Sequence, residues 1–404
     1  MRITLKRWLI LFFIPAALAF SCNTNAPASA SELRRDTLPQ PKAHLSAADS
    51  IQLLLNSKNN KLIIRRLDSL FAYKFKNKGF NGNLLIARDG LILYKKAWGV
   101  KDFKTKDALD IGSAFQLGSS SKPLTALAVI ILKERGLLNY DQTVNDFFPA
   151  FPYKGVTIRQ LLTHRSGLPN YMYFCDQLYC CQDVPLTNDK LLDLMIEKHP
   201  PKYYPPNKKF EYCNTNYSLL VNIIEKVSKK KFGQFMHDEV FAPLQMNHTW
   251  VCQADSNKAH KNKTIGHKAN RQHYYDDYLD GIQGDKNIFT TVDDLFLFDQ
   301  ALYHGKLISD SSLQLAYTGA SHEHNGRRNY GFGWRMVDEP NGEKLIYHNG
   351  WWHGYNNVFF RRINDKTTII ILSNKITAGV YNTEDVMDIL DGSKGGDVID
   401  DNDN

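Results

Sequence analysis

The sequence lacks internal repeats, and its basic residues are scattered along the chain. No segment recurs at a fixed period, which excludes a solenoid or another repeat architecture. Lys and Arg total 50 against 42 Asp and Glu, a formal net charge of +8, but they form no concentrated run. The charge is therefore weak support for nucleic-acid binding, and we expect no nucleic-acid partner. A hydrophobic content of 43% with 23% charged residues also excludes wholesale disorder.

The sequence also has no apolar run of membrane-spanning length. The N-terminal run from Trp8 to Phe20 has 13 residues, too few for a comfortable span. It follows the basic segment MRITLKR and predicts a secretory signal at residues 1–22. Two cleavage sites compete: Ala17–Ala19 forms an A-x-A site, whereas Leu18–Cys22 looks like a lipobox that would place a lipid on Cys22. Both predict export.

A flexible tether would follow the signal. Residues 23–45 are rich in Ala, Ser, Pro and Asn, which is typical of a chain that holds a domain away from a membrane. We therefore favour the lipoprotein, and expect the protein in the periplasm or cell envelope, anchored to a membrane. At the other end, Glu384–Asn404 carries eight acidic residues and one lysine, so the rest of the chain has a charge of about +15. Such a basic body suits anionic lipid or cell-wall polymer, and residues 391–404 are predicted to be a disordered acidic tail.

Cysteine is sparse after Cys22. In an oxidising compartment the five remaining cysteines allow at most two disulfides and leave one free thiol. Three of them lie in the segment YMYFCDQLYCCQD, which indicates a loop disulfide plus buried thiols. A zinc site is the alternative, but the spacing C-x4-C-C lacks the paired pattern of zinc ligands. The five are Cys175, Cys180, Cys181, Cys213 and Cys252.

Hydrophobic periodicity predicts an α+β fold. Residues 50–78 and 119–136 have apolar residues at helical spacing, and two strands flank Asp89-Gly90, a dipeptide typical of a hairpin turn. A helix-rich middle precedes short aromatic and β-branched strands near the C-terminus. We expect an antiparallel sheet of N- and C-terminal strands flanked by helices, with an inserted, mostly helical subdomain. The domain would span residues 46–390, with an α/β part at about 46–115 and 285–390 and a helical part at about 116–284.

The segment GSSSKPLTA places three serines before Lys122. Only Ser119 has the lysine three residues later, and side chains at i and i+3 lie on one face of a helix. A helix start also favours negative charge that develops nearby. S-x-x-K is a weak signal by itself, because Ser228 and Lys231 match it too. A polar helix cap is therefore the alternative to a nucleophile.

Two further short motifs change that balance. Tyr212 and Asn214 lie two residues apart just before another predicted helix, so they would point the same way from an extended segment. The tyrosine could take a proton, and the asparagine could hold a lysine or a substrate carbonyl. His348-Asn349-Gly350 ends a predicted strand, and its glycine would let a ligand approach the backbone.

In this order, the three motifs resemble the active-site set of the serine β-lactamase and penicillin-binding-protein superfamily. The nearest subgroup comprises the class C β-lactamases, D,D-carboxypeptidases and related esterases. The segment TIRQLLTHRSGL is similar to a long and specific family segment, and further similar segments follow in order over residues 80–375. They are PLQMNHT, GDKNIFTTVDDLFLF, YGFGW and IIILSN. The resemblance implies the fold predicted above, with no metal and no organic cofactor.

The resemblance also implies roles for individual residues. Ser119 would attack a carbonyl and form an acyl-enzyme. Either Lys122 or Tyr212 could collect the serine proton; free tyrosine titrates near ~10, so Tyr212 would need the positive lysine close by. Asn214 would orient Lys122 and the substrate amide. The oxyanion hole would consist of the N–H groups of Ser119 and Trp351.

The third motif departs from the family pattern. True β-lactamases usually have K-T-G where this chain has His348, Asn349 and Gly350. Histidine is mostly neutral at pH 7, so the site loses a permanent charge for a substrate carboxylate, and the asparagine replaces a hydroxyl. Both changes weaken the case for a dedicated penicillin hydrolase. We expect an electrostatic task for His348 and a packing role for Cys213.

Several other residues are ambiguous. His164 is better explained as a hydrogen-bonded residue that orders a loop than as a base. The segment HYYDDYLDG, residues 273–281, suggests a carboxylate metal site, but no second ligand set follows it. Five aromatic residues could line a substrate cleft or form a hydrophobic rim between the helical part and the sheet. They are Trp351, Trp352, Tyr171, Tyr173 and Phe174.

The sequence thus predicts an exported serine hydrolase that acts through an acyl-enzyme on small amide or ester substrates. D-amino-acid peptides are the first candidate, as for a D,D-carboxypeptidase. A broad-specificity esterase or a β-lactamase is the alternative among enzymes. A catalytically weak penicillin- or peptide-binding protein is the alternative of another class, although every expected catalytic position is filled.

Overall fold

A computed structural model of the chain describes residues 52–253, 260–321, 323, 326–377 and 379–392. The chain divides into the units Met1–Ser46 and Ala47–Asn404, and all the described residues belong to the second. The predicted signal, the lipidation site Cys22 and the tether lie outside the described residues, as do residues 393–404 of the predicted tail. Within the described part, no helix has the length and apolar composition needed to cross a membrane.

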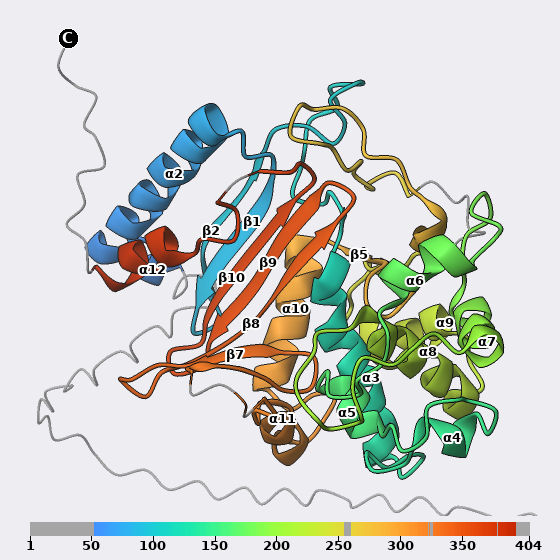
Figure 1. Cartoon of the computed structure of the whole chain (residues 1–404). Coiled ribbons are helices and arrows are strands. Elements are labelled where there is room, and N and C mark those ends of the chain that lie inside the picture. Colours follow the sequence, from blue (N-terminus) through green and yellow to red (C-terminus); the bar gives the residue numbers. More distant parts are fainter. Residues whose placement is uncertain (1–51, 254–259, 322, 324–325, 378, 393–404) are drawn as a thin grey trace, which may run out of the picture. The chain divides into compact units, whose positions relative to one another are not determined.

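A seven-stranded antiparallel sheet joins the two ends of the domain (Figure 1). Early strand β1 pairs with late strand β10, with Gly82 opposite Ser373 and Ala87 opposite Thr368. This pairing confirms the prediction that N- and C-terminal strands share one sheet. In spatial order the strands are β2 (Leu91–Trp98), β1 (Gly82–Arg88), β10 (Thr367–Ser373), β9 (Tyr355–Arg362), β8 (Lys344–Trp352), β7 (Arg335–Asp338) and β6 (Arg328–Tyr330).

Helices cover both faces of this sheet. Side chains alternate between the faces along β1: Leu84 and Ile86 belong to a core with helix α2, while Leu85 and Ala87 belong to the larger core that includes helix α10. The predicted hairpin between β1 and β2 is confirmed, because Asp89 and Gly90 both have positive φ, 48° and 77°, as a type I′ turn requires. The covering helices are α2 (Lys58–Lys78), α10 (Val292–Tyr303) and α12 (Glu384–Asp391).

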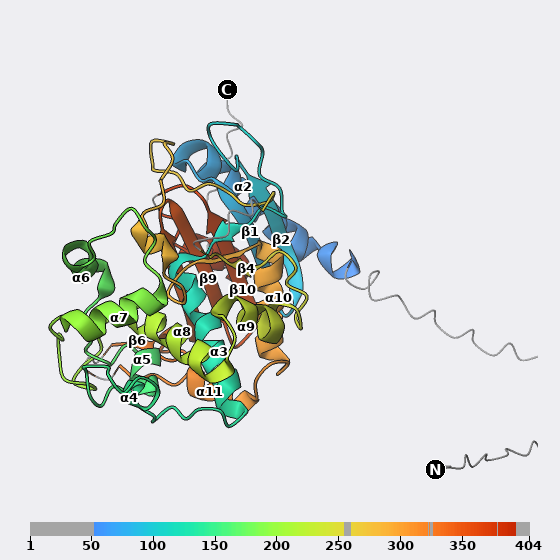
Figure 2. The same ribbon diagram turned by 90° about the vertical axis from the view of Figure 1, so that its right-hand side faces the viewer.

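The helical part is built around α3 (Lys122–Glu134). Its residues 122–132 are all buried, which is typical of a helix that packs on every side. Helix α8 (Asn214–Ser228) lies against it, and shorter helices surround the pair (Figure 2). These are α4 (Val144–Phe147), α5 (Ile158–Leu162), α6 (Tyr171–Leu178), α7 (Asn188–Lys198), α9 (Phe232–Met236) with the turn η2 (His237–Phe241), η3 (Tyr278–Gly281) and α11 (Asp310–Ala316). A small sheet of β3 (Phe115–Gln116), β5 (Ile288–Thr290) and β4 (Trp250–Val251) links the two parts.

The helix predicted over residues 119–136 begins differently. Residues Gly118–Ser121 form a tight 3-10 turn, η1, and the α-helix starts only at Lys122. Pro123 explains the change: it has no N–H to donate to the carbonyl of Ser119, four residues earlier. The Lys122 N–H bonds the Ser119 carbonyl instead. The serines therefore lie on a turn between the sheet and α3.

The cysteines of the described residues are all free. Cys175 and Cys213 are buried, whereas Cys180 and Cys181 are exposed neighbours with their sulfurs 3.1 Å apart. The predicted loop disulfide is therefore wrong. Cys175 is buried within α6, whereas the other two cysteines of the segment are exposed after the end of that helix.

Candidate active site

Lys122 is the centre of a hydrogen-bonded cluster. Its side chain is fully buried, and Nζ donates to Ser119 Oγ (3.0 Å) and to Asn214 Oδ1 (2.8 Å). A third bond of 3.2 Å goes to the backbone carbonyl of Asp285. The S-x-x-K and Y-x-N motifs, 92 residues apart at Lys122 and Asn214, thus meet at one ammonium group.

Two glycines allow the turn η1 to lie against β8. A Cβ atom on Gly350 would be 1.9 Å from the carbonyl oxygen of Leu117, and one on Gly118 would be 2.9 Å from backbone atoms of Trp351. Gly118 also has a φ of +52°, which favours glycine. Ser120 stabilises the contact between η1 and β8, since its Oγ donates a hydrogen bond to the His348 carbonyl at 2.8 Å. The backbones that carry the two candidate oxyanion donors are therefore neighbours.

The neighbouring serines do not cap the helix. No side-chain hydrogen bond caps α3 at Ser121. Its Oγ instead accepts a bond from the N–H of Ile288 in β5, at 3.4 Å. With the contact from Ser120 to β8, the two hydroxyls that follow Ser119 in the chain attach its turn to two strands. The capping hypothesis does not describe this segment.

Tyr212 covers the buried lysine. Its ring centroid lies 4.9 Å from Lys122 Nζ, close enough for a cation–π contact. Cys213 is extended, with φ −140°, and precedes Asn214, the first residue of α8. The Cys213 N–H donates to Nδ1 of His164 at 3.2 Å, and its thiol is buried. The packing role expected of Cys213 is consistent with this position.

His348 and His164 are buried and joined through Tyr330. The Tyr330 hydroxyl lies 3.2 Å from Nε2 of each ring. Burial, with the charges of Arg335 and Lys122, holds the pKa of His348 well below its usual range. Burial and Lys122 lower the pKa of His164 as well. Both imidazoles are thus neutral at pH 7, and His164 is a hydrogen-bonded structural residue, as predicted.

A cavity of about 290 Å³ opens beside Ser119. Its lining includes Tyr212 and the third-motif residues His348, Asn349 and Gly350. Trp351 lines it too, together with three residues that belong to none of the predicted site motifs: Arg335, Tyr347 and Tyr381. The Tyr381 hydroxyl donates to the Gly350 carbonyl at 2.9 Å. The pocket therefore has a cation, although not the one that the family motif would supply.

The predicted aromatic cleft forms only in part. Trp351 is 44% exposed and lines the cavity beside Ser119. Tyr171 and Trp352 are buried, while Tyr173 is 68% exposed. Phe174 packs partly buried against the core. Of the five aromatics, Trp351 alone lines this cavity, and the others fit the rim interpretation better.

A buried polar group lies behind Lys122. Asp285, whose carbonyl accepts from Lys122, also accepts through Oδ2 from the Tyr171 hydroxyl at 2.7 Å. Lys286 is 2% exposed, donates to the same hydroxyl at 2.6 Å and lies 4.5 Å from the Trp352 ring centroid. Burial lowers the pKa of Lys286. The sequence showed these residues as part of the segment GDKN, but their burial depends on tertiary packing.

Among the described residues, two separate clusters of three side chains could each hold a metal ion, because the ligand atoms within each cluster lie within 4.8 Å of one another. In one, His353 joins Asp276 and Asp280 of the carboxylate segment 273–281. Burial alone would lower the pKa of His353, but hydrogen bonds and charges from Asp277 and Asp280 outweigh it and raise the pKa to about 9. His353 forms ion pairs with Asp277 (3.4 Å) and Asp280 (3.1 Å), which stabilise the protonated ring. In the other, Asp102 Oδ1 lies 3.2 Å from His267 Nε2 and 2.7 Å from His273 Nε2.

The family model described as Beta-lactamase matches residues 67–393. The chain is 36% identical over 328 residues to penicillin-binding protein 4* of Bacillus subtilis (strain 168), covering 77% of this chain and 72% of that protein. Its fold is similar to that of a penicillin-binding protein from Bacillus halodurans, with a TM-score of 0.70 and 22% identity over 80% of this chain and 99% of that chain. A D-amino acid amidase from Ochrobactrum anthropi SV3, complexed with L-phenylalanine amide, gives a TM-score of 0.67 and 21% identity over 83% and 99% of the two chains.

The two solved structures establish the α+β fold, and the family match and the Bacillus subtilis relative establish the family. The resemblance inferred from the motifs is thereby confirmed. This chain belongs to the β-lactamase family and is a serine hydrolase of the superfamily that also contains the penicillin-binding proteins.

Proposed function

We propose that Ser119 forms an acyl-enzyme with small amide or ester substrates that carry a free carboxylate, D-amino-acid peptides first among them. The observation that carries this proposal is the arrangement of Ser119 Oγ, hydrogen-bonded to buried Lys122, at the edge of a cavity that also contains Arg335. A carboxylate suits an arginine, which can bind both of its oxygens. A D,D-carboxypeptidase substrate ends in such a carboxylate.

The reaction would proceed in two halves. Ser119 Oγ bonds the carbonyl carbon while its proton passes to Tyr212 or to the neutral amine of Lys122, and the oxyanion accepts hydrogen bonds from the N–H groups of Ser119 and Trp351. The C–N or C–O bond then breaks, and the leaving group takes the proton. Water attacks the acyl-enzyme, which releases a carboxylic acid and restores Ser119. Asn214 would keep Lys122 in position throughout, through its 2.8 Å hydrogen bond.

Labelling with a fluorophosphonate and a fluorescent penicillin tests the nucleophile. The wild-type chain should gain the mass of one label, and Ser119→Ala should gain none. Ser228→Ala is a matched control because Ser228 and Lys231 form the second S-x-x-K match of the chain. Equal labelling of wild type and Ser119→Ala would contradict the assignment.

Turnover of three substrate types separates the enzyme classes. We expect hydrolysis of a peptide ending in D-Ala-D-Ala and slower hydrolysis of neutral p-nitrophenyl esters. Ester turnover without peptide turnover would favour the esterase, and rapid penicillin hydrolysis would favour a β-lactamase. Penicillin labelling with no turnover of any substrate would favour a binding protein.

The proposal includes export and a lipid anchor on Cys22. The basic segment, the apolar run and the lipobox-like residues Leu18–Cys22 support it. In a cell that processes lipoproteins, Cys22→Ala should move the protein from the membrane fraction to the soluble fraction. Membrane association that survives this substitution would contradict the anchor.

A further inference from the structure

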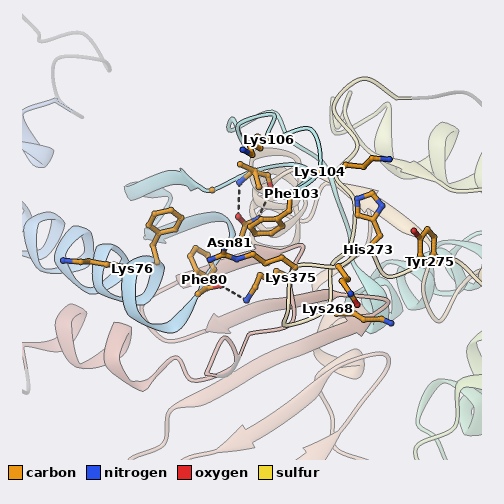
Figure 3. A pocket seen from close by; sticks show the side chains of 16 residues that line it. Lys76, Phe80, Asn81, Phe103, Lys104, Lys106, Lys268, His273, Tyr275 and Lys375 are labelled. Carbon is orange, nitrogen blue, oxygen red and sulfur yellow. Dashed lines mark hydrogen bonds between the residues drawn. The ribbon is translucent and has the colours of Figure 1, made fainter.

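A second and larger cavity, of about 1120 Å³, lies where β1 begins and β10 ends (Figure 3). Four segments form its walls: the end of α2, the loop that follows β2, the loop of residues 268–275 and the residues after β10. We call it the basic groove. Ser119 does not line it, and the residues that line the catalytic cavity form a separate set.

Six cationic side chains line the basic groove, and its lining contains no Asp or Glu. Among the described residues, none of the six has an ion pair, whereas lysines elsewhere on the domain, such as Lys95 and Lys101, do. Figure 3 labels five of these side chains, which come from separate segments; the side chain of Lys76 points away from the other four. The six are Lys76, Lys104, Lys106, Lys268, Arg271 and Lys375.

Lys375 is the buried member of this set. It is 7% exposed, and its Nζ donates to the backbone carbonyls of Gly79 (3.2 Å) and Ile376 (3.4 Å). Burial and the charge of Arg271 lower the pKa of its ammonium. A buried cation beside a second cation, held only by carbonyl oxygens, is a costly arrangement. A bound anion would offset that cost.

The nearby carboxylate does not neutralise the groove. Asp102 lies next to Phe103 in the loop after β2, but its Oδ1 faces the rings of His267 and His273. The backbone N–H of Lys104, two residues later, donates to the same Oδ1 at 2.8 Å. The charges of the lysine side chains therefore remain available to a ligand.

The size and apolar surfaces of the groove indicate the kind of anion. Phe75, Phe103 and Tyr275 line it together with the cations. A cavity of about 1120 Å³ slightly exceeds the ~1,000 Å³ upper end of ordinary ligand sites, so it would hold a larger group than a single phosphate ion. Several cations around one cavity favour a ligand with more than one negative charge, and Lys and Arg are the usual donors to phosphate oxygens.

We propose that the basic groove binds phosphate-bearing ligands of headgroup size, either a soluble phosphorylated sugar or the headgroup of an anionic phospholipid. The site is independent of the hydrolytic reaction. It lies near the catalytic cavity, because Tyr274, in the loop that forms one wall, packs against Trp351 with ring centroids 6.4 Å apart. A phospholipid headgroup bound in the basic groove would thus hold the catalytic cavity close to the membrane surface.

Charge reversal on the full chain tests the site. The groove variant combines Lys104→Glu, Lys268→Glu and Arg271→Glu, three exposed positions whose side chains line the cavity. The control combines Lys202→Glu, Lys208→Glu and Lys306→Glu, three exposed lysines outside the groove with the same change in charge. Fructose 1,6-bisphosphate is the soluble probe, with fructose as its reference. Vesicles of phosphatidylglycerol and phosphatidylcholine are the lipid probe, with pure phosphatidylcholine vesicles as their reference.

The groove variant should bind the preferred probe on the order of 100-fold more weakly, since each lost cation weakens such contacts severalfold. The control variant should bind as the wild type does, and added salt should weaken wild-type binding. If the groove variant lost binding to fructose 1,6-bisphosphate alone, the ligand would be a soluble phosphorylated sugar. If it lost binding to the vesicles alone, the ligand would be a lipid headgroup. Thermal unfolding of both variants verifies that they fold.

Three results would overturn the proposal. The wild type could bind neither phosphate probe above its reference. The two triple variants could lose binding equally, which would mean a general attraction between charges. Polyglutamate could compete as well as the phosphate probes, which would mean that the groove takes any polyanion, acidic peptides included.

Discussion

Arg335 lies against the ring of Tyr212, with its guanidinium carbon 5.0 Å from the ring centroid. The strand pairing explains this position, because Arg335 of β7 is opposite Tyr347 of β8, one residue before the third motif. Both Arg335 and Tyr212 line the cavity beside Ser119. The permanent positive charge in this cavity therefore comes from β7, since His348 is neutral.

Replacement of Arg335 should separate substrates by charge. Arg335→Gln should lower kcat/KM for a peptide with a free carboxylate about 10–100-fold, mainly through KM, because a hydrogen bond to a charged group is lost. Neutral p-nitrophenyl esters should react almost as before. Steady-state kinetics with both substrates measure the difference.

Arg335→Lys is the matched variant for this prediction. It keeps the charge but loses the two-pronged contact with a carboxylate, so its kcat/KM should fall between those of the wild type and Arg335→Gln. If Arg335→Gln slowed neutral esters as much as the peptide, Arg335 would support the fold of the site and not the recognition of a carboxylate.

Tyr212→Phe should separate the two possible proton acceptors. The ring and its contact with Lys122 remain, and only the hydroxyl is lost. If Tyr212 exchanges the serine proton, kcat should fall about 10²–10⁴-fold, as for other general acid–base groups. The rate of fluorophosphonate labelling and kcat with a neutral ester measure the loss, and we expect both to fall. A variant with nearly full activity would leave Lys122, which bonds Ser119 Oγ directly, as the acceptor.

Short sequence motifs predicted the parts of the site whose residues lie close together in the chain. Ser119 and Lys122 are three residues apart, and the turn places their side chains 3.0 Å apart even though it is not the α-helix that was expected. The strands β1 and β10 were expected to share a sheet because predicted strands at both ends of the domain enclose a helix-rich middle, and they are paired. The long similarity at TIRQLLTHRSGL made the family recognisable before the fold was known.

Arg335 could not be found in this way. The family-like segment YGFGW ends one residue before it, but that likeness gives Arg335 no role, and only the register between β7 and β8 brings it beside the third motif. Lys286 is a similar case: a lysine in a sequence is usually exposed, yet this one is 2% exposed beneath Trp352. The positions of the Arg335 and Lys286 charges are thus set by packing between segments that are distant in the sequence. His353 also joined the carboxylates of residues 273–281 only through the fold.

His353 should make stability depend on pH. Its pKa is raised from 6.5 to about 9 in the folded chain, because two carboxylates outweigh the effect of burial. A raised pKa adds stability that is fully present below pH 6.5 and is lost as the pH rises through 9. His353→Asn should therefore lower the free energy of unfolding by up to about 3 kcal/mol at pH 6 and by much less at pH 9.5.

Denaturant unfolding of both chains between pH 6 and 9.5 measures this difference. Asparagine suits the comparison because it tolerates the positive φ of 35° at this position. A difference in unfolding free energy that stays constant over the range would mean that the contacts of His353 do not depend on its charge.

Gly350→Ala should disable the site by moving the turn that carries Ser119. The new Cβ atom would lie 1.9 Å from the Leu117 carbonyl oxygen and 3.0 Å from Ser120 Oγ. Since the first of these is a backbone atom, η1 must move away from β8, and with it the Ser119 N–H. A displacement of about 1 Å at a catalytic group can cost on the order of 100-fold in rate, and overpacking typically costs about 1–3 kcal/mol of stability.

Gly326→Ala is the control, because a Cβ atom there meets no atom of the described residues within 4 Å. The fluorophosphonate labelling rate and the thermal unfolding midpoint should both fall for Gly350→Ala and change little for Gly326→Ala. A Gly350→Ala chain that labels at the wild-type rate would show that η1 can move without disturbing Ser119, and the close contact between η1 and β8 would then not be what positions the nucleophile.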